Sequence, residues 1–82
     1  MTDDKLLQRI TVDPTILVGK PVIKGTRLSV ESILNQLAHG ATVDELAAEY
    51  AGLTIEDIQA CLLFASRSLD NTEFMPLMAE TG

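Results

Sequence analysis

The stretch that decides the fold runs from Thr42 to Ile58 and reads TVDELAAEYAGLTIEDI. It contains one signal twice: a hydroxyl residue, then a β-branched residue, acids and an aliphatic residue. Each hydroxyl can accept a hydrogen bond from the unpaired amides of a first helical turn, and the acids favour the positive end of the helix dipole. Thr42 with Glu45 forms a full capping box. The stretch therefore predicts the starts of two helices joined by a short corner.

A third copy of this signal, Ser29-Val30-Glu31-Ser32-Ile33, lies upstream. The spacing of apolar residues then predicts helices over residues 30–39, 43–50 and 55–70. The first of these would end at Gly40 in a left-handed conformation. The positions expected to be buried in the three helices are Val30, Ile33, Leu34, Leu37, Leu46, Ala47, Tyr50, Ile58, Cys61, Leu62, Ala65 and Leu69.

Ahead of the helices the pattern becomes that of strands. Ile10-Thr11-Val12-Asp13 alternates like a short strand, and Pro14 ends it. Residues 21–23 and 26–28 flank Lys24-Gly25, whose glycine supplies the positive φ that a tight hairpin turn needs. We therefore predict a mainly α fold, with three capped helices preceded by a short N-terminal strand and a β-hairpin.

The length of 82 residues and the apolar content of 46% fit one domain with a modest core. We divide the chain into an N-terminal extension (1–8), a hairpin and three-helix domain (9–70) and a C-terminal tail (71–82). No run of residues is long and apolar enough to cross a membrane, and the acidic start does not have the form of a signal peptide. The single cysteine excludes a disulfide framework. We therefore expect a cytoplasmic protein.

Charge is distributed unevenly along the chain, whose net charge is -6. Residues 1–27 hold five cations against three acids, a balance of +2. Residues 28–82 hold Arg67 against nine acids, a balance of -8. The basic part could meet an anion or an acidic surface, whereas the acidic part suits a basic protein partner or serves solubility alone.

Residues suited to catalysis or metal binding are scarce. His39 is the only histidine, and its place before Gly40 indicates a role in ending a helix. Cys61 is expected to be buried, which disfavours a reactive thiolate. The sequence has neither a metal-ligand cluster nor a glycine-rich phosphate loop. We therefore expect no enzymatic activity, catalytic residue, metal site or cofactor.

A resemblance to a known family rests mainly on the ordered string GKPVIKGTR at residues 19–27. Its other parts are Asp13-Pro14, Leu37-Ala38-His39-Gly40, Glu45-Leu46-Ala47 through Tyr50, Leu53-Thr54, Glu56-Asp57-Ile58 and Ala60. From about Arg9 to Ser66 the chain resembles the bacterial family catalogued as domain of unknown function 433. It departs from the family pattern at Ala51, where proline is expected after the tyrosine.

The resemblance implies a homeodomain-like helix-turn-helix core. It also implies an antitoxin of the VapB type, with a PIN-like ribonuclease toxin as its partner and with DNA binding as a means of regulating its own operon. The acidic part of the chain suits this role, because a ribonuclease must present positive charge to RNA. The alternatives are a DNA-binding regulator without a toxin and a structural homodimer of unknown role. A homodimer is expected under all three hypotheses.

Two sets of residues are the candidates for binding. The set for DNA contains Lys20, Lys24, Thr26, Arg27, Thr54 and Gln59. Arg27 could instead pair with Glu31, and the acids that begin the last helix would oppose phosphates. The set for a protein partner contains Leu63 and Phe64 of the last helix with Phe74, Met75, Leu77 and Met78 of the tail. The tail could equally fold back on its own core, and Leu63 and Phe64 could fill it.

Overall fold

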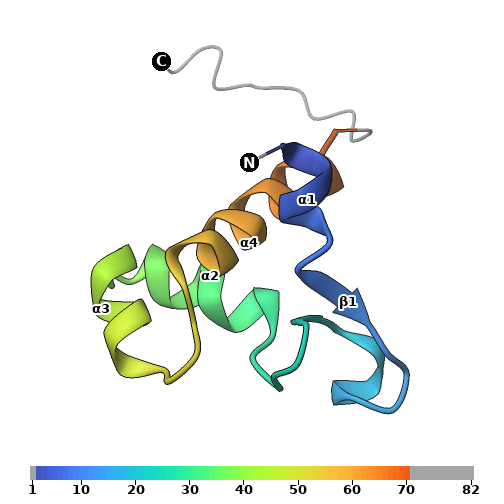
Figure 1. Cartoon of the computed structure of the whole chain (residues 1–82), viewed down its shortest axis with the longest axis horizontal. Helices are drawn as coiled ribbons and strands as arrows, with labels where there is room; N and C mark the ends of the chain where they lie inside the picture. The colour runs from blue at the N-terminus through green and yellow to red at the C-terminus, as the bar shows by residue number, and fades with distance from the viewer. Residues whose placement is uncertain (1, 71–82) are drawn as a thin grey trace.

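The computed structural model describes residues 2–70, which form four α-helices and one two-stranded antiparallel sheet (Figure 1). The elements are α1 (Asp3–Leu7), β1 (Ile10–Val12), the 3-10 turn η1 (Leu17–Gly19), β2 (Pro21–Ile23), α2 (Val30–Ala38), α3 (Val43–Glu49) and α4 (Ile55–Ser68). The mainly α architecture and the three predicted helices are confirmed. The tail, with Phe74, Met75, Leu77 and Met78, lies outside the described residues.

The three predicted helices begin at the hydroxyl caps. Ser29 Oγ accepts from the Ser32 amide at 3.0 Å, and Thr42 Oγ1 accepts from the Glu45 amide at 3.1 Å. The Glu45 carboxylate in turn accepts from the Thr42 amide at 2.9 Å, which completes the predicted capping box. Thr54 caps α4 in the same way. The starts of these helices are therefore fixed by contacts within four residues of sequence.

The strand pairing differs from the prediction. β2 pairs with β1 in the register Ile10↔Ile23 and Val12↔Pro21. On its other side, toward residues 26–28, the Ile23 amide donates to the Leu28 carbonyl at 3.0 Å, but no second strand forms there. The turn at Lys24-Gly25 does form, with Gly25 at φ 82°. After the turn, however, Thr26 Oγ1 donates to the Ile23 carbonyl and accepts from the Leu28 amide. These local bonds satisfy backbone groups beside the turn, and only the single bridge Val22↔Ser29 remains on that side of β2.

Helix α1 forms within the segment to which the sequence analysis assigned no element. The Thr2 hydroxyl caps it, and an Asp3–Arg67 ion pair of 2.8 Å joins its start to the end of α4. Just after α1, Arg9 reaches Asp57 in the first turn of α4 at 3.0 Å. The two pairs hold this segment against α4, and Figure 1 shows α1 next to the C-terminal end of α4. Five residues are too few for a periodic pattern, so this helix depends on its cap and on the tertiary contacts with α4.

The core lies between the sheet, α2, α3 and α4. Its buried apolar residues are Val22, Ile23, Val30, Ile33, Leu46, Leu53, Ile58, Ala60 and Cys61. The prediction was wrong for Leu62 and Leu69, which are 46% and 66% exposed. Residues 60–65 are all apolar, so periodicity alone did not identify the face of α4 that the other elements cover.

The burial of Cys61 predicts a thiol that reacts only when the protein unfolds. Its side chain is fully buried, and burial with the nearby Asp57 charge raises the pKa of the thiol from 9.0 to about 11. At pH 8 we expect an aromatic disulfide reagent to react at least ~100-fold more slowly with the folded protein than in guanidinium chloride. Absorbance of the released thiolate measures both rates, and similar rates would contradict the burial.

The same pKa shift predicts a loss of stability in alkali. The unfolded thiol loses its proton near pH 9, whereas the folded one holds it to about pH 11. Above pH 9 the unfolded state therefore binds fewer protons, and the Cys61 contribution to stability falls as the pH rises toward 11. Denaturant midpoints measured across this range should fall less in a Cys61→Ala variant than in the parent protein.

Candidate protein-binding site

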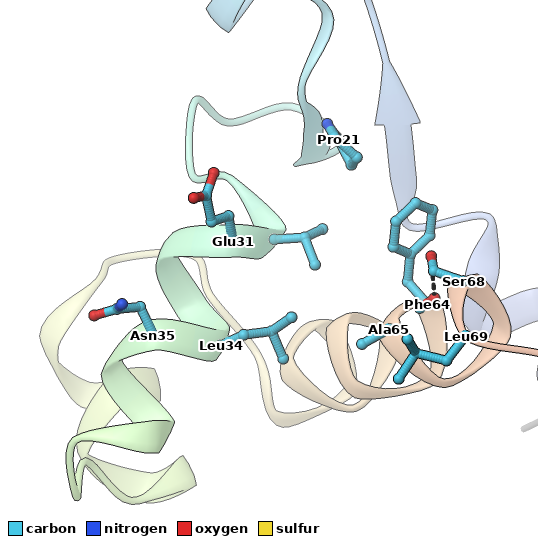
Figure 2. A pocket seen from close by; sticks show the side chains of 9 residues that line it. Pro21, Glu31, Leu34, Asn35, Phe64, Ala65, Ser68 and Leu69 are labelled. Atoms are coloured by element: carbon cyan, nitrogen blue, oxygen red, sulfur yellow. Dashed lines mark hydrogen bonds between the residues drawn. The ribbon is translucent and has the colours of Figure 1, made fainter. Parts of the chain in front are cut away.

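An apolar groove of about 530 Å³ lies between α2 and α4, with Pro21 of β2 beside it (Figure 2). Its lining residues are Pro21, Val30, Glu31, Leu34, Asn35, Phe64, Ala65, Ser68 and Leu69. We call this feature the α2–α4 groove. A concave surface of this size, lined by aliphatic and aromatic side chains, can accept apolar side chains of a ligand or a protein.

Helical spacing builds both walls of the α2–α4 groove. Val30 and Leu34 are four residues apart on α2, so they lie one above the other on the same face. On α4, Phe64 and Ser68 have the same spacing. The Ser68 hydroxyl donates to the Phe64 carbonyl at 2.9 Å, drawn as the dashed line in Figure 2. Because this hydroxyl is satisfied within its own helix, it does not need a polar partner from a ligand.

An ion pair lies at the rim of the α2–α4 groove. Lys20 Nζ donates to the Glu31 carboxylate at 2.8 Å, and both side chains are largely exposed. The hydrogen bond and the charge of Lys20 lower the pKa of Glu31. The predicted alternative, an Arg27–Glu31 pair, is therefore wrong, because Lys20 takes the Glu31 carboxylate.

Three exposed aliphatic side chains follow one line along α4. Ile55, Leu62 and Leu69 are 43%, 46% and 66% exposed, and each is seven residues from the next. Seven residues are close to two helical turns, so these side chains share one face of the helix. We call them the α4 apolar row. The row ends at Leu69, which also lines the α2–α4 groove, so the two surfaces are continuous.

The residues predicted to meet a protein partner are only partly those of the groove. Phe64 lines it and also packs against the core, whereas Leu63 is half-buried and does not line it. Leu34 and Leu69 line the groove, although the sequence analysis assigned both to the core. The sequence signal that could have identified Leu69 as a surface residue is the seven-residue spacing of the aliphatic residues Ile55, Leu62 and Leu69.

The residues predicted to meet DNA are spread over several elements. Lys20 lies at the groove rim and Thr26 organises the turn after β2. Lys24 lines a second cavity together with Lys5 and Arg9. The remaining three are the exposed Arg27, the α4 cap Thr54 and the exposed Gln59 of α4. Whether any of them contacts DNA stays a prediction.

Residues 2–70 contain no group of three His, Cys, Asp or Glu side chains that could hold a metal ion. None of the helices in this range is long and apolar enough to cross a membrane. His39 lies at the end of α2, where its Nδ1 is 2.8 Å from the Asn35 carbonyl.

Comparison with known proteins gives three similarities. The family described as "Protein of unknown function (DUF433)" matches residues 10–65. An uncharacterized protein of Archaeoglobus fulgidus is 54% identical over 26 residues, which are 32% of this chain and 72% of that protein. The crystal structure of a DUF433 member from Anabaena variabilis is similar with a TM-score of 0.72 and 31% sequence identity, over 82% of this chain and 67% of that chain.

Proposed function

Because this chain belongs to the DUF433 family, we propose that it is an antitoxin-like regulatory protein that binds and neutralises a PIN-like ribonuclease toxin. The observation that carries this proposal is the open apolar α2–α4 groove, with the α4 apolar row continuing from it. Exposed apolar surface of this extent is typical of a protein-binding face. The VapB-type role itself comes from the resemblance of residues 9–66 to that family.

The groove favours a partner segment with apolar side chains. Leu34, Phe64 and Leu69 offer aliphatic and aromatic surface on both walls. Burying such surface contributes roughly 25 cal/mol per Å² before the costs of association are subtracted. A helix or an extended segment of the toxin that places two or three apolar side chains in the groove is therefore the occupant that we propose.

The charge of the groove-bearing part favours a basic partner. Residues 28–70 hold seven acids against Arg67, a balance of -6. Four of these acids, Asp44, Glu45, Glu49 and Glu56, are exposed on α3 and at the start of α4. A ribonuclease presents positive charge where it holds RNA, so its active face would attract this surface at long range.

A homeodomain-like arrangement of α2, α3 and α4 is part of the same proposal, with operon autoregulation through a helix-turn-helix. The corner between α3 and α4 has the short length of this motif, and Gly52 adopts φ 86° within it. Glu56 at the start of α4 would face phosphates unfavourably in such a complex. DNA binding is therefore the weaker part of the proposal, and it would depend on charge supplied by the toxin.

The test is reconstitution with the product of an adjacent PIN-like gene, whose presence beside this gene is the first prediction of the proposal. We expect the two purified chains to elute together and nuclease activity on a model RNA to fall as the chain is added up to equimolar amounts. Separate elution with undiminished activity would refute the proposal. Light scattering of the chain alone tests self-association through the α4 apolar row, the other use of this surface.

A Leu69→Asp variant tests the groove as the toxin-binding surface. Leu69 is 66% exposed, so the substitution should leave the fold intact while placing a charge in the groove. We expect toxin affinity to fall at least ~30-fold, since the contact of one buried leucine contributes about 2 kcal/mol. Val18→Asp is the matched control, because Val18 is 94% exposed on η1 and does not line the groove. Equal losses in both variants would show that charge, and not the groove, controls binding.

A further inference from the structure

Three of the six cations of this acidic chain line one cavity. The chain has six Lys and Arg residues in all. Lys20 and Arg67 are engaged in ion pairs with carboxylates at 2.8 Å. Three of the others, Lys5, Arg9 and Lys24, line a single cavity of about 380 Å³ together with Gln8 and Asp57. We call this the basic cavity, and it shares no residue with the α2–α4 groove.

The fold brings these cations together from three separate segments. Helix α1 supplies Lys5, and the residues between α1 and β1 include Arg9. Lys24 follows β2, and its amide donates to the Arg9 carbonyl at 2.7 Å, which fixes the two residues side by side. The position of α1 and the pairing of β1 with β2 therefore set the spacing of the three positive charges.

Asp57 offsets only one of the three positive charges. Its carboxylate is already engaged, because Oδ1 accepts from Arg9 Nη1 at 3.0 Å and Oδ2 accepts from the Thr54 amide at 3.0 Å. The Arg9 side chain remains 32% exposed, and a guanidinium has five N–H donors in a planar fork. Among the described residues only the Nη1 donor has a hydrogen-bond partner. Asp57 therefore orients Arg9 and leaves donors for a ligand.

Three cations lining one cavity repel each other, and the cavity keeps a balance of +2 after Asp57 is counted. The core does not require this arrangement, since Lys5 and Lys24 are exposed. An anion with several acceptor oxygens would relieve the repulsion, because Arg binds phosphate bidentately and Lys binds it as a point charge. The Gln8 amide adds a neutral donor.

We propose that the basic cavity binds a phosphate group, with Arg9 as the bidentate ligand and Lys5 and Lys24 as flanking charges. The phosphate belongs either to a small phosphorylated compound or to the backbone of a nucleic acid, and both present the same oxygens. The negative charge of the rest of the chain restricts such binding to this cavity, because it repels phosphates elsewhere on the surface.

The experiment is a two-dimensional NMR titration of the full chain at low salt, with four separate probes: inorganic phosphate, pyrophosphate, ADP and a short DNA duplex. We expect saturable shifts concentrated at the amides of Lys5, Gln8, Arg9 and Lys24. Binding of a free phosphate probe identifies a small ligand as the source, and binding of the duplex alone identifies a nucleic acid. No saturable shift with any probe would overturn the proposal.

Two double variants test whether the site is local. Lys5→Ala/Lys24→Ala removes two charges from the basic cavity, and Lys20→Ala/Arg27→Ala removes two cations that do not line it. We expect the first to weaken the apparent affinity at least ~10-fold and the second less than ~2-fold. Equal weakening in both would overturn the local site in favour of net charge alone. Arg9 is left intact because its removal would leave the buried Asp57 carboxylate without its ion-pair partner.

Discussion

Replacing Ile58 by alanine is expected to lower the free energy of unfolding by about 3 to 4 kcal/mol. Ile58 is fully buried in the core cluster with Ile23, Ile33 and Leu46, so the truncation removes buried apolar surface and leaves a cavity. A chain this small has a net stability of only several kcal/mol, so the variant should be close to unfolding at room temperature. Denaturant titration followed by circular dichroism measures the difference.

The control for this substitution is on the same helix. Ile55→Ala makes the same chemical change at a position that is 43% exposed. We expect a loss of less than about 1 kcal/mol there, because the site can fill with water and its surface was only partly buried. Similar losses at both positions would mean that the buried face of α4 has been assigned wrongly.

Replacing Asp57 by alanine is expected to lower the free energy of unfolding by about 3 kcal/mol. Asp57 is only 7% exposed, and the substitution removes two contacts at once. The α4 capping box loses the acceptor of the Thr54 amide, and Arg9 loses its ion pair between α4 and the segment after α1. We place the loss at the lower end for a buried pair, because the Arg9 side chain is 32% exposed to water.

A control substitution and a double-mutant cycle show how much of the Asp57 contribution comes from the ion pair with Arg9. Glu56→Ala removes the neighbouring acid of the same turn, which is exposed, and should cost much less than Asp57→Ala. A double-mutant cycle of Arg9→Ala with Asp57→Ala measures the coupling, which we expect to exceed about 1 kcal/mol. Additive losses would show that Asp57 acts only as a cap.

Helix α4 is the organising element of the molecule. Its buried residues Ile58 and Cys61 belong to the core, whereas Phe64 and Leu69 form one wall of the α2–α4 groove. Its first turn supplies Asp57 to the basic cavity. The groove and the basic cavity can therefore be tested independently, since Leu69 does not line the cavity and neither Lys5 nor Lys24 lines the groove.

The sequence by itself determined the features that depend on neighbours along the chain. Ser29, Thr42 and Thr54 begin their helices because a hydroxyl and the amide it caps are three residues apart. Gly40 after α2 and Gly25 in the turn adopt a positive φ, as expected, because the helix end and the tight turn need a conformation that glycine adopts without strain. The burial of Cys61 also followed from its apolar helical context.

Tertiary structure alone decided which surfaces meet. The strand partner of β2 is β1, and the register brings Ile10 opposite Ile23 at the core. Residues 26–28, expected to form a strand, contribute only the Leu28 carbonyl that accepts from the Ile23 amide, because Thr26 bonds locally at the turn. Arg9 and Asp57 are 48 residues apart in sequence, so no local pattern could connect them. The exposure of Leu69 likewise depends on which side of α4 the other elements cover. Local hydrogen bonds set where helices start, but only long-range packing chooses the faces that remain free for partners.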